Sequence, residues 1–249
     1  MKTNMIKALP VAAIMALLSQ TAHADTFSVG AGALAATSPY RGYDTKYYPL
    51  PVINYDGDTF YVHTLVAGYN LWKDQQNQLS IIAGYNPLSF RPGHSDNEQL
   101  KRLKKRHGTL MAGLAYSYNA EWGTIRTTLT GDTLDNSNGI VGDVAYLYAI
   151  KGDNWAVVPG VGVTWDSANQ NKYYYGISNR ESYRSGLESY KPNDSFTPYV
   201  EVSAKYSFNP QWQAFVTGRY TRLTNEIKDS PMVNKSYTGL LMTGVTYTF

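Results

Sequence analysis

The sequence contains no cysteine and only four histidines among its 249 residues. The absence of cysteine excludes disulfide-stabilised folds, thiolate metal sites and cysteine nucleophiles. An excess of one charge is also missing, because 22 basic and 19 acidic residues give a formal net charge of +3. So small a balance offers no global electrostatic reason to expect nucleic-acid binding.

Only one long apolar run is present, and it lies at the N-terminus. Basic residues precede an apolar stretch from Ala8 to Leu18, and Ala22 and Ala24 fit the small-x-small pattern that signal peptidase reads. About eleven apolar residues are too few for a membrane helix, which needs roughly 20. The sequence therefore predicts a cleaved signal peptide over residues 1–24 and one exported domain over residues 25–249.

What is abundant is tyrosine, with 22 residues, and alternation of apolar and polar side chains. No later segment is apolar enough for a membrane helix, so any membrane span must be built from strands. Residues 196–208 place apolar side chains at even positions and mostly polar ones at odd positions, and residues 212–221 resume the pattern with Phe215 as an exception. Trp155 and Trp165 bracket a third such segment, as an aromatic girdle requires.

The C-terminus carries a second specific signal. Val245, Tyr247 and the terminal Phe249 match the pattern by which barrel strands are recognised for outer-membrane insertion. A long aromatic edge strand left unpaired in water would promote aggregation, and closing the sheet removes that edge. The sequence thus indicates localisation in the outer membrane of a Gram-negative bacterium, in contact with its lipid and lipopolysaccharide.

The predicted fold class is all-β, a transmembrane antiparallel up-and-down β-barrel of about twelve strands with both termini in the periplasm. Ten strands is the alternative, because two of the segments are short. The expected strands cover residues 27–36, 48–55, 58–63, 66–73, 78–89, 108–119, 123–132, 139–150, 154–165, 196–207, 211–222 and 238–249. In this topology the short turns lie on the periplasmic side and the long connections on the extracellular side.

Charged side chains on the polar faces of these strands should point into the lumen. The candidates are Arg126, Asp132, Asp143, Glu201, Lys205 and Arg219. They could form a ladder of salt bridges that stiffens the wall, or line a narrow polar pore. The balanced signs and the modest interior of a barrel of this size favour the ladder.

One concentrated basic run falls in a predicted extracellular loop. It consists of Lys101, Arg102, Lys104, Lys105 and Arg106. Such a patch could bind lipopolysaccharide phosphates or an acidic host surface, although a solvated face is the ordinary explanation of a charge run. Leu100 and Leu103 interrupt the charges at the spacing of a short helix, which would lie on the barrel rim.

Candidate catalytic residues are sparse. The mature chain has His63, His94 and His107, and a catalytic histidine needs an orienting carboxylate and a nearby nucleophile. Asp132 and Asp143 resemble part of an acidic cluster, but the residues between them more simply form a turn. There is no phosphate-binding glycine loop and no cofactor motif. We therefore expect a protein that is not an enzyme and uses no cofactor and no metal.

Several longer motifs distinguish the chain from a generic barrel. They cover residues 48–55 (YPLPVINY), 131–141 (GDTLDNSNGIV), 173–176 (YYYG), 192–195 (PNDS), 220–223 (YTRL) and 229–233 (DSPMV). With these motifs the chain resembles the MipA/OmpV family of outer-membrane proteins over essentially the whole mature sequence. The resemblance implies a non-enzymatic scaffold that brings a murein-cleaving lytic transglycosylase together with a bifunctional penicillin-binding murein synthase in peptidoglycan growth.

A second function stays open at this point. Family relatives are also associated with adhesion and with antibiotic or osmotic responses. The long extracellular loops would then carry a surface receptor or adhesin, or the lumen would form a narrow pore, and the periplasmic side would be inert. Short periplasmic turns fit this alternative more easily than they fit a scaffold, because a stable complex usually buries at least about 1,200 Å².

Overall fold

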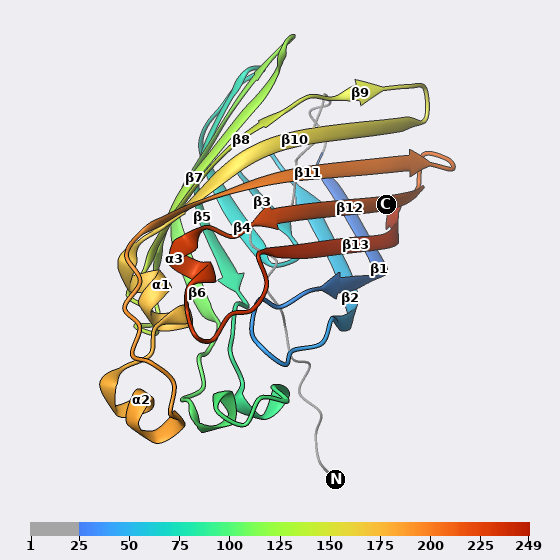
Figure 1. Ribbon diagram of the computed structural model, residues 1–249. Helices are drawn as coiled ribbons and strands as arrows, with labels where there is room; N and C mark the ends of the chain where they lie inside the picture. Colours follow the sequence, from blue (N-terminus) through green and yellow to red (C-terminus); the bar gives the residue numbers. More distant parts are fainter. Residues whose placement is uncertain (1–24) are drawn as a thin grey trace.

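The computed structural model describes residues 25–249, which form a closed antiparallel β-barrel (Figure 1). Successive strands pair in chain order, and β1 pairs with β13 to close the sheet. The strands are β1 (Thr26–Ala36), β2 (Lys46–Asp56), β3 (Phe60–His63), β4 (Val66–Lys73), β5 (Asn77–Asn86), β6 (Thr109–Ala120), β7 (Gly123–Asp132), β8 (Ile140–Leu147), β9 (Ile150–Lys151), β10 (Trp155–Asp166), β11 (Ser195–Ser207), β12 (Trp212–Arg222) and β13 (Tyr237–Thr248). The expected cleavage site at Ala22 and Ala24 lies outside the described residues.

Proline explains why thirteen strand segments make a barrel of twelve strands. β8 and β9 both pair with β10 in one continuous register, and the amide of Tyr148 between them donates to the carbonyl of Pro159 at 3.0 Å. The reciprocal hydrogen bond, from residue 159 to the carbonyl of Tyr148, cannot form because proline has no N–H. The ladder is therefore interrupted at Tyr148, and β8 and β9 are one strand. The prediction of twelve strands is confirmed, and the alternative of ten is wrong.

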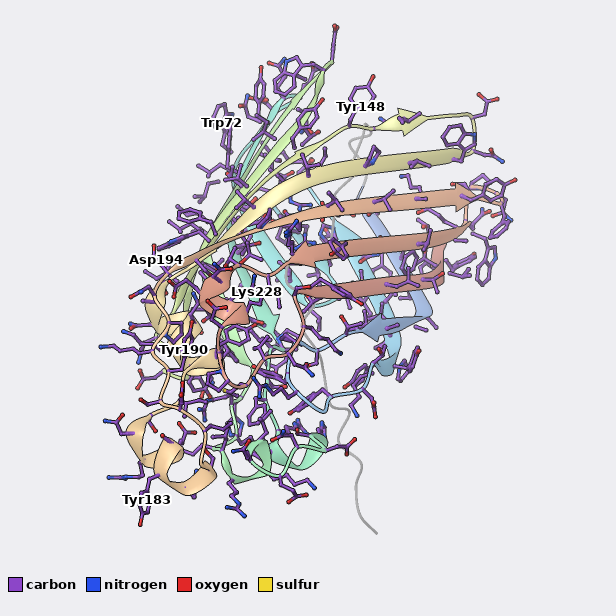
Figure 2. All side chains as sticks on the ribbon, viewed as in Figure 1. Trp72, Tyr148, Tyr183, Tyr190, Asp194 and Lys228 are labelled. Carbon is purple, nitrogen blue, oxygen red and sulfur yellow. The ribbon has the colours of Figure 1, made fainter. Side chains whose placement is uncertain are left out.

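The outer face of the barrel is apolar and rich in aromatic side chains (Figure 2). In lipid every backbone polar group of a spanning segment must be paired within the protein, which a closed sheet achieves. Trp72, Trp122, Trp155 and Trp212 lie near the short turns with exposed fractions of 42% to 52%. They form the aromatic girdle at the periplasmic end, and Trp165 lies toward the opposite end of β10.

The lumen is not uniformly polar. Leu34, Leu50, Val52 and Met242 form a buried apolar cluster on β1, β2 and β13, and Phe215 packs against it. The apolar residue that broke the alternation of β12 is thus an inward side chain with apolar neighbours. Part of the barrel interior is therefore filled by side chains.

The extracellular end carries the helical elements, which gather at one end of the barrel in Figure 1. They are η1 (Pro92–His94), η2 (Leu100–Arg102), α1 (Ala168–Tyr175), α2 (Asn179–Ser185) and α3 (Asn225–Lys228). Ser178 and Glu181 form a capping box at the start of α2, and Gly186 ends the helix in the left-handed conformation with φ 73°. No helix within residues 25–249 is both long and apolar enough to cross a membrane.

One hairpin is much shorter than the others. β3 pairs with β2 only from Asn54 to Asp56, and the chain turns back at Thr64, whose φ is 50°. The extracellular part of β2, residues 46–53, is paired with β1 but has no strand partner on its other side. The wall of the barrel is therefore interrupted between β2 and the tip of the β3–β4 hairpin.

Candidate functional site

Four of the predicted lumen charges form one cluster on the inner face of the barrel. Glu201 on β11 accepts from Arg126 Nη2 on β7 at 3.0 Å and from Arg219 Nη2 on β12 at 2.6 Å. Asp143 on β8 lies 4.0 Å from Arg126. Because β8 and β10 lie between β7 and β11 in the sheet, the contact between Arg126 and Glu201 joins strands that are not adjacent.

Tyr199 joins the two halves of this cluster. Its hydroxyl donates to Asp143 at 2.8 Å, and the guanidinium carbon of Arg219 lies 3.9 Å from the centre of its ring. Thr164 donates a further hydrogen bond to Asp143 at 2.9 Å. Tyr199 was not among the residues predicted from the sequence, although its position two residues before Glu201 on the inward face of β11 was a signal for it.

Burial makes the geometry of this cluster important. The Glu201 side chain is 2% exposed, and the two arginine side chains are 12% and 10% exposed. Charges this deep are tolerated only when each is paired and hydrogen-bonded. The arrangement matches a set of salt bridges that ties β7, β8, β11 and β12 together on the inner face of the barrel.

The other two predicted lumen charges, Asp132 and Lys205, are not part of this cluster. Asp132 is the last residue of β7, and its carboxylate accepts from the Thr109 hydroxyl and from the backbone amides of Leu134, Ser137 and Asn138. It builds the extracellular turn between β7 and β8 and is not part of the lumen cluster. Lys205 is half-buried on the same face of β11 as Glu201, nearer the periplasmic end.

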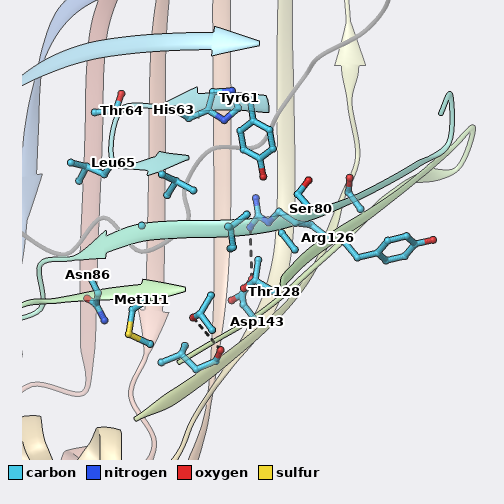
Figure 3. A pocket seen from close by; sticks show the side chains of 18 of the residues that line it. Tyr61, His63, Thr64, Leu65, Ser80, Asn86, Met111, Arg126, Thr128 and Asp143 are labelled. Carbon is cyan, nitrogen blue, oxygen red and sulfur yellow. Dashed lines mark hydrogen bonds and ion pairs between the residues drawn. The ribbon is translucent and has the colours of Figure 1, made fainter. Parts of the chain in front are cut away.

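A cavity of about 200 Å³ adjoins the cluster within the lumen (Figure 3). Its walls come from most of the strands and combine Leu50, Leu65, Ile82, Met111 and Met242 with Arg126 and Asp143. Polar side chains such as His63, Ser80 and Asn86 also line the cavity, but most of its exposed surface is apolar. This composition is typical of sites for small molecules with an apolar body.

The extracellular loops fold over the barrel into a compact cap. We define the cap by its buried side chains: Tyr40, Phe90, Leu100, Leu103, Tyr174, Tyr175, Ile177, Leu187, Leu223, Ile227, Met232 and Val233. These residues come from every long extracellular connection except residues 133–139. Burial raises the pKa of Tyr43 at the edge of the cap to about 12, even though its hydroxyl also accepts from the Arg91 amide.

The basic run is not the uniform surface patch that we expected. Arg106 is buried, and its guanidinium binds Glu181 Oε1 at 2.8 Å and the carbonyls of Tyr173, Lys104 and Gly176. The expectation that Arg106 faces solvent is therefore wrong. It faces inward because five N–H donors can bind several carbonyls and a carboxylate at once. The capping-box pattern was the sequence signal for Glu181.

The remaining basic residues of the run are exposed, namely Lys101, Arg102, Lys104 and Lys105. Lys101 pairs with Glu98 at 2.6 Å, and the carbonyl of Arg102 accepts from Arg184. Leu100 and Leu103 are buried in the cap, and residues 100–102 form the short helix η2. The leucine spacing thus indicated correctly which face of this segment is buried.

The histidines do not assemble a catalytic set with one another. His63 Nε2 lies 2.7 Å from the Asp56 carboxylate near the hairpin, whereas His107 is exposed and His94 lies in η1. The hydroxyl of Ser80, another residue of the cavity wall, donates to Asn70. Across residues 25–249, no three histidine, aspartate or glutamate side chains gather in a group that could hold a metal ion.

A family model described as MltA-interacting protein MipA matches residues 29–249. The chain belongs to the MipA family. Among its relatives, the MltA-interacting protein of Escherichia coli (strain K12) is 51% identical over 98% of this chain and 99% of its own length.

Two more relatives and one solved structure also align with the chain. The putative outer membrane protein YiaT of Escherichia coli (strain K12) is 39% identical, over 92% of this chain and 93% of its own. Outer membrane protein OmpV of Vibrio cholerae is 23% identical, over 91% and 88%. A solved structure, the COG4313 outer membrane channel from Pseudomonas putida F1, aligns with TM-score 0.46 and 10% identity over 92% of this chain and 97% of its own.

These relatives establish the setting of the MipA-family barrel. It is a protein of the outer membrane of Gram-negative bacteria. The relatives are named for an interaction or for their location. The side chains of Val245 and Phe249, two residues of the predicted insertion signal, are exposed on the outside of the barrel. The ring of Phe249 stacks on that of Phe27, with 5.6 Å between the ring centres. A role of these residues in insertion stays a prediction.

Proposed function

We propose that this barrel is a non-enzymatic scaffold that binds a lytic transglycosylase at its periplasmic rim and holds it near a bifunctional murein synthase. The observation that carries the proposal is the 51% identity, over nearly the full length of both chains, to a protein named MltA-interacting protein. The synthase comes from the family resemblance of the sequence motifs. Peptidoglycan lies in the periplasm, so the partners must approach from the side of the short turns.

The shape of that side limits how a partner can bind. The periplasmic turns are residues 57–59, 74–76, 121–122, 152–154 and 208–211. No single turn of this length offers the area of about 1,200 Å² that a stable complex usually buries. A partner must therefore contact several turns around the rim, or bind transiently.

Charge gives the rim a distinct character. Exposed carboxylates lie on nearly every turn or strand end there, namely Asp25, Asp58, Asp74, Glu121 and Asp153. Lys73 and Lys151 are exposed basic residues at this end of the barrel, and Lys73 lies 3.7 Å from Asp58. An acidic rim favours a partner with a basic surface, and such an attraction is screened by salt.

The direct test is an affinity pull-down from detergent-solubilised envelopes with the tagged mature barrel. An unrelated barrel of similar size serves as the control. We expect the transglycosylase and the synthase to be retained by this barrel and not by the control. Retention of neither would contradict the proposal.

Charge variants locate the contact surface. In the rim variant, Asp58→Asn, Glu121→Gln and Asp153→Asn remove three exposed carboxylates. The matched control removes three exposed carboxylates from the extracellular end by Glu98→Gln, Asp135→Asn and Glu188→Gln. We expect weaker retention by the rim variant alone, and a smaller difference at high salt.

A surface receptor is the second candidate function. It is favoured by the exposed basic residues of the extracellular run and by Tyr183, which is 95% exposed at the outer surface of α2. Deletion of residues 179–185 that abolishes cell-surface binding while leaving transglycosylase retention intact would separate the two functions. Loss of transglycosylase retention in the same deletion would connect them.

A further inference from the structure

The lumen cavity plays no part in the scaffold function, yet it has the features of a binding site. Most of its exposed surface is apolar and comes from side chains that include Leu50, Ile82 and Met242, with polar side chains between them. Arg126 and Arg219 bring positive charge to the lining, and Figure 3 shows Arg126 at the cavity. A concave apolar space with a few convergent polar groups is the usual form of a small-molecule site.

The hydrogen bonding of Arg126 is incomplete. Its Nη2 binds Glu201 and lies 3.4 Å from the Tyr199 hydroxyl, but its Nε and Nη1 are buried and have no hydrogen-bond partner among the described residues. A guanidinium carries five N–H donors, and buried donors without acceptors are costly. An acceptor from a bound molecule would satisfy them after a small rotation of the guanidinium.

The charges nearby indicate which acceptor fits. Arg126 and Arg219 are already balanced by Asp143 and Glu201, so an added anion would leave excess negative charge in a poorly hydrated site. A neutral oxygen accepts the same hydrogen bonds without that penalty. We propose that the cavity binds a small uncharged molecule with an apolar body and a carbonyl or similar oxygen, which accepts from Arg126.

The interruption of the barrel wall between β2 and the β3–β4 hairpin provides an entry route for the ligand. The carbonyl of Ile53 points away from β1, because it accepts from the amide of Thr64. Backbone groups alternate along an antiparallel strand, so those of Pro49 and Pro51 point to the same unpaired side. Proline has no N–H, so at these two positions the exposed edge of β2 presents no donor for another strand or for unpaired burial in lipid.

The same edge lies beside the cavity. Thr64 and Leu65 at the hairpin tip line the cavity, as does Leu50 on the unpaired part of β2. At the extracellular end the lumen is covered by the cap. The ligand therefore enters sideways from the outer leaflet, between β2 and the β3–β4 hairpin, rather than through the extracellular mouth.

Ligand binding can be measured with prodan, a neutral naphthyl ketone whose emission reports apolar surroundings. The full barrel is placed in lipid nanodiscs, and empty nanodiscs give the background. We expect saturable binding of prodan and none of the anionic probe anilinonaphthalene sulfonate beyond background. Equal saturable binding of the anion, or no saturable binding of prodan, would overturn the proposed ligand class.

Two variants separate the site from the fold. Ala115 lines the cavity on β6, while Leu114 beside it faces lipid with 48% exposure. We expect Ala115→Phe to abolish prodan binding and Leu114→Phe to leave it unchanged. Arg126→Leu should weaken binding by roughly tenfold or more, the loss expected for a hydrogen bond to a charged donor. Equal binding by all three variants would exclude this cavity.

The lateral entry route can be tested by site-directed spin labelling. The chain has no cysteine, so an introduced cysteine is labelled alone. A nitroxide is attached at Thr64→Cys on the hairpin tip, and at Thr128→Cys on β7, which lines the same cavity from a strand paired on both sides. Collisions with oxygen report contact with lipid, and collisions with a nickel chelate report contact with water. We expect high oxygen and low nickel accessibility at residue 64 alone. A label at residue 64 reached mainly by nickel would overturn the lateral route.

Discussion

Arg106 and Glu181 form a buried ion pair, 2.8 Å between Nη2 and Oε1, that joins the loop after β5 to the loop after β10. The two side chains are 8% and 5% exposed. Glu181 also accepts from the backbone amide of Lys104, so the carboxylate fixes both the arginine and the chain beside it. Segments 75 residues apart in sequence thus become one cap.

Removing Arg106 should loosen the cap and leave the barrel intact. In Arg106→Ala the buried Glu181 loses its charged partner, and breaking such a pair costs about 3–5 kcal/mol. We expect limited proteolysis to cut residues 95–107 or 177–190 much faster than in the unmodified protein. Lys105→Ala is the control, because Lys105 is an exposed neighbour and should change nothing. Equal cleavage of both variants would show that the pair does not hold the cap.

The cap should also respond to acid. Burial alone would raise the pKa of Glu181, but the hydrogen bonds from the Lys104 amide and the Arg106 guanidinium outweigh it and lower the pKa overall. A lowered folded-state pKa contributes stability that is present above the unfolded-state pKa, near 4.3, and is lost as pH falls through the folded-state value. Protease resistance of the cap should therefore decrease as the pH falls below about 4.

Glu181→Gln provides the control for this pH dependence. The amide cannot titrate, so the variant should begin with a weaker cap and show a flatter acid profile. Hydrogen exchange of residues 177–190, measured across the acid range, reports the same change without protease. Profiles of the same steepness in the two proteins would assign the acid response to other groups.

Much of the barrel follows from the sequence because its pattern is local. Alternation with a period of two fixes which face of each strand meets lipid, and it placed Glu201 and Arg219 inside. The interruption at Tyr148 was not expected, because it depends on Pro159 of the neighbouring strand. The pairing register must be known before a proline can be assigned to one side of a ladder.

The cap could not be predicted in the same way. Its core joins residues such as Tyr40, Phe90, Tyr174 and Met232, which come from different loops and share no period. Arg106 appeared in sequence as one more member of a charge run, and only its contact with Glu181 distinguishes it from Lys105. Irregular segments acquire their burial from long-range contacts that local patterning does not encode.

The lumen cluster should make a large contribution to barrel stability. Glu201→Ala leaves both Arg126 and Arg219 without their shared carboxylate, with an expected loss of about 3–5 kcal/mol. Urea unfolding in detergent, followed by the shift between folded and unfolded bands on gels, measures this loss. Lys205→Ala, on the same face of β11, should cost far less. If the two variants unfold at the same urea concentration, the cluster is not a structural brace.

Variants of Phe249 can distinguish a role in insertion from a role in the structure of the barrel. The side chain is 76% exposed, and its ring contacts are with Phe27 and Tyr247. Deleting Phe249 should therefore lower the amount of barrel inserted in cells while leaving refolding in detergent nearly unchanged. Replacement by tyrosine, which keeps an aromatic C-terminus, should restore most of the insertion. A barrel that fails to refold in detergent would instead assign Phe249 to the fold.

Two prolines on the outer face should respond in opposite ways to the same substitution. Pro159→Ala restores an N–H that faces the carbonyl of Tyr148, so it completes the ladder between β8 and β10. Pro51→Ala creates an N–H on the side of β2 where no strand is paired. Both changes remove the stabilisation that proline gives through the unfolded chain, about 0.4–1 kcal/mol, and that effect cancels in the comparison.

The remaining difference is the hydrogen bond. We expect Pro51→Ala to be less stable than Pro159→Ala by about 1–3 kcal/mol, the cost of a buried unpaired donor. Urea unfolding of the two variants in lipid vesicles measures this difference, and chemical cross-linking detects any dimer that forms by pairing at the new edge. Equal stability without dimers would mean that the new N–H of residue 51 finds a partner, and the wall between β2 and the β3–β4 hairpin would then be closed in the membrane.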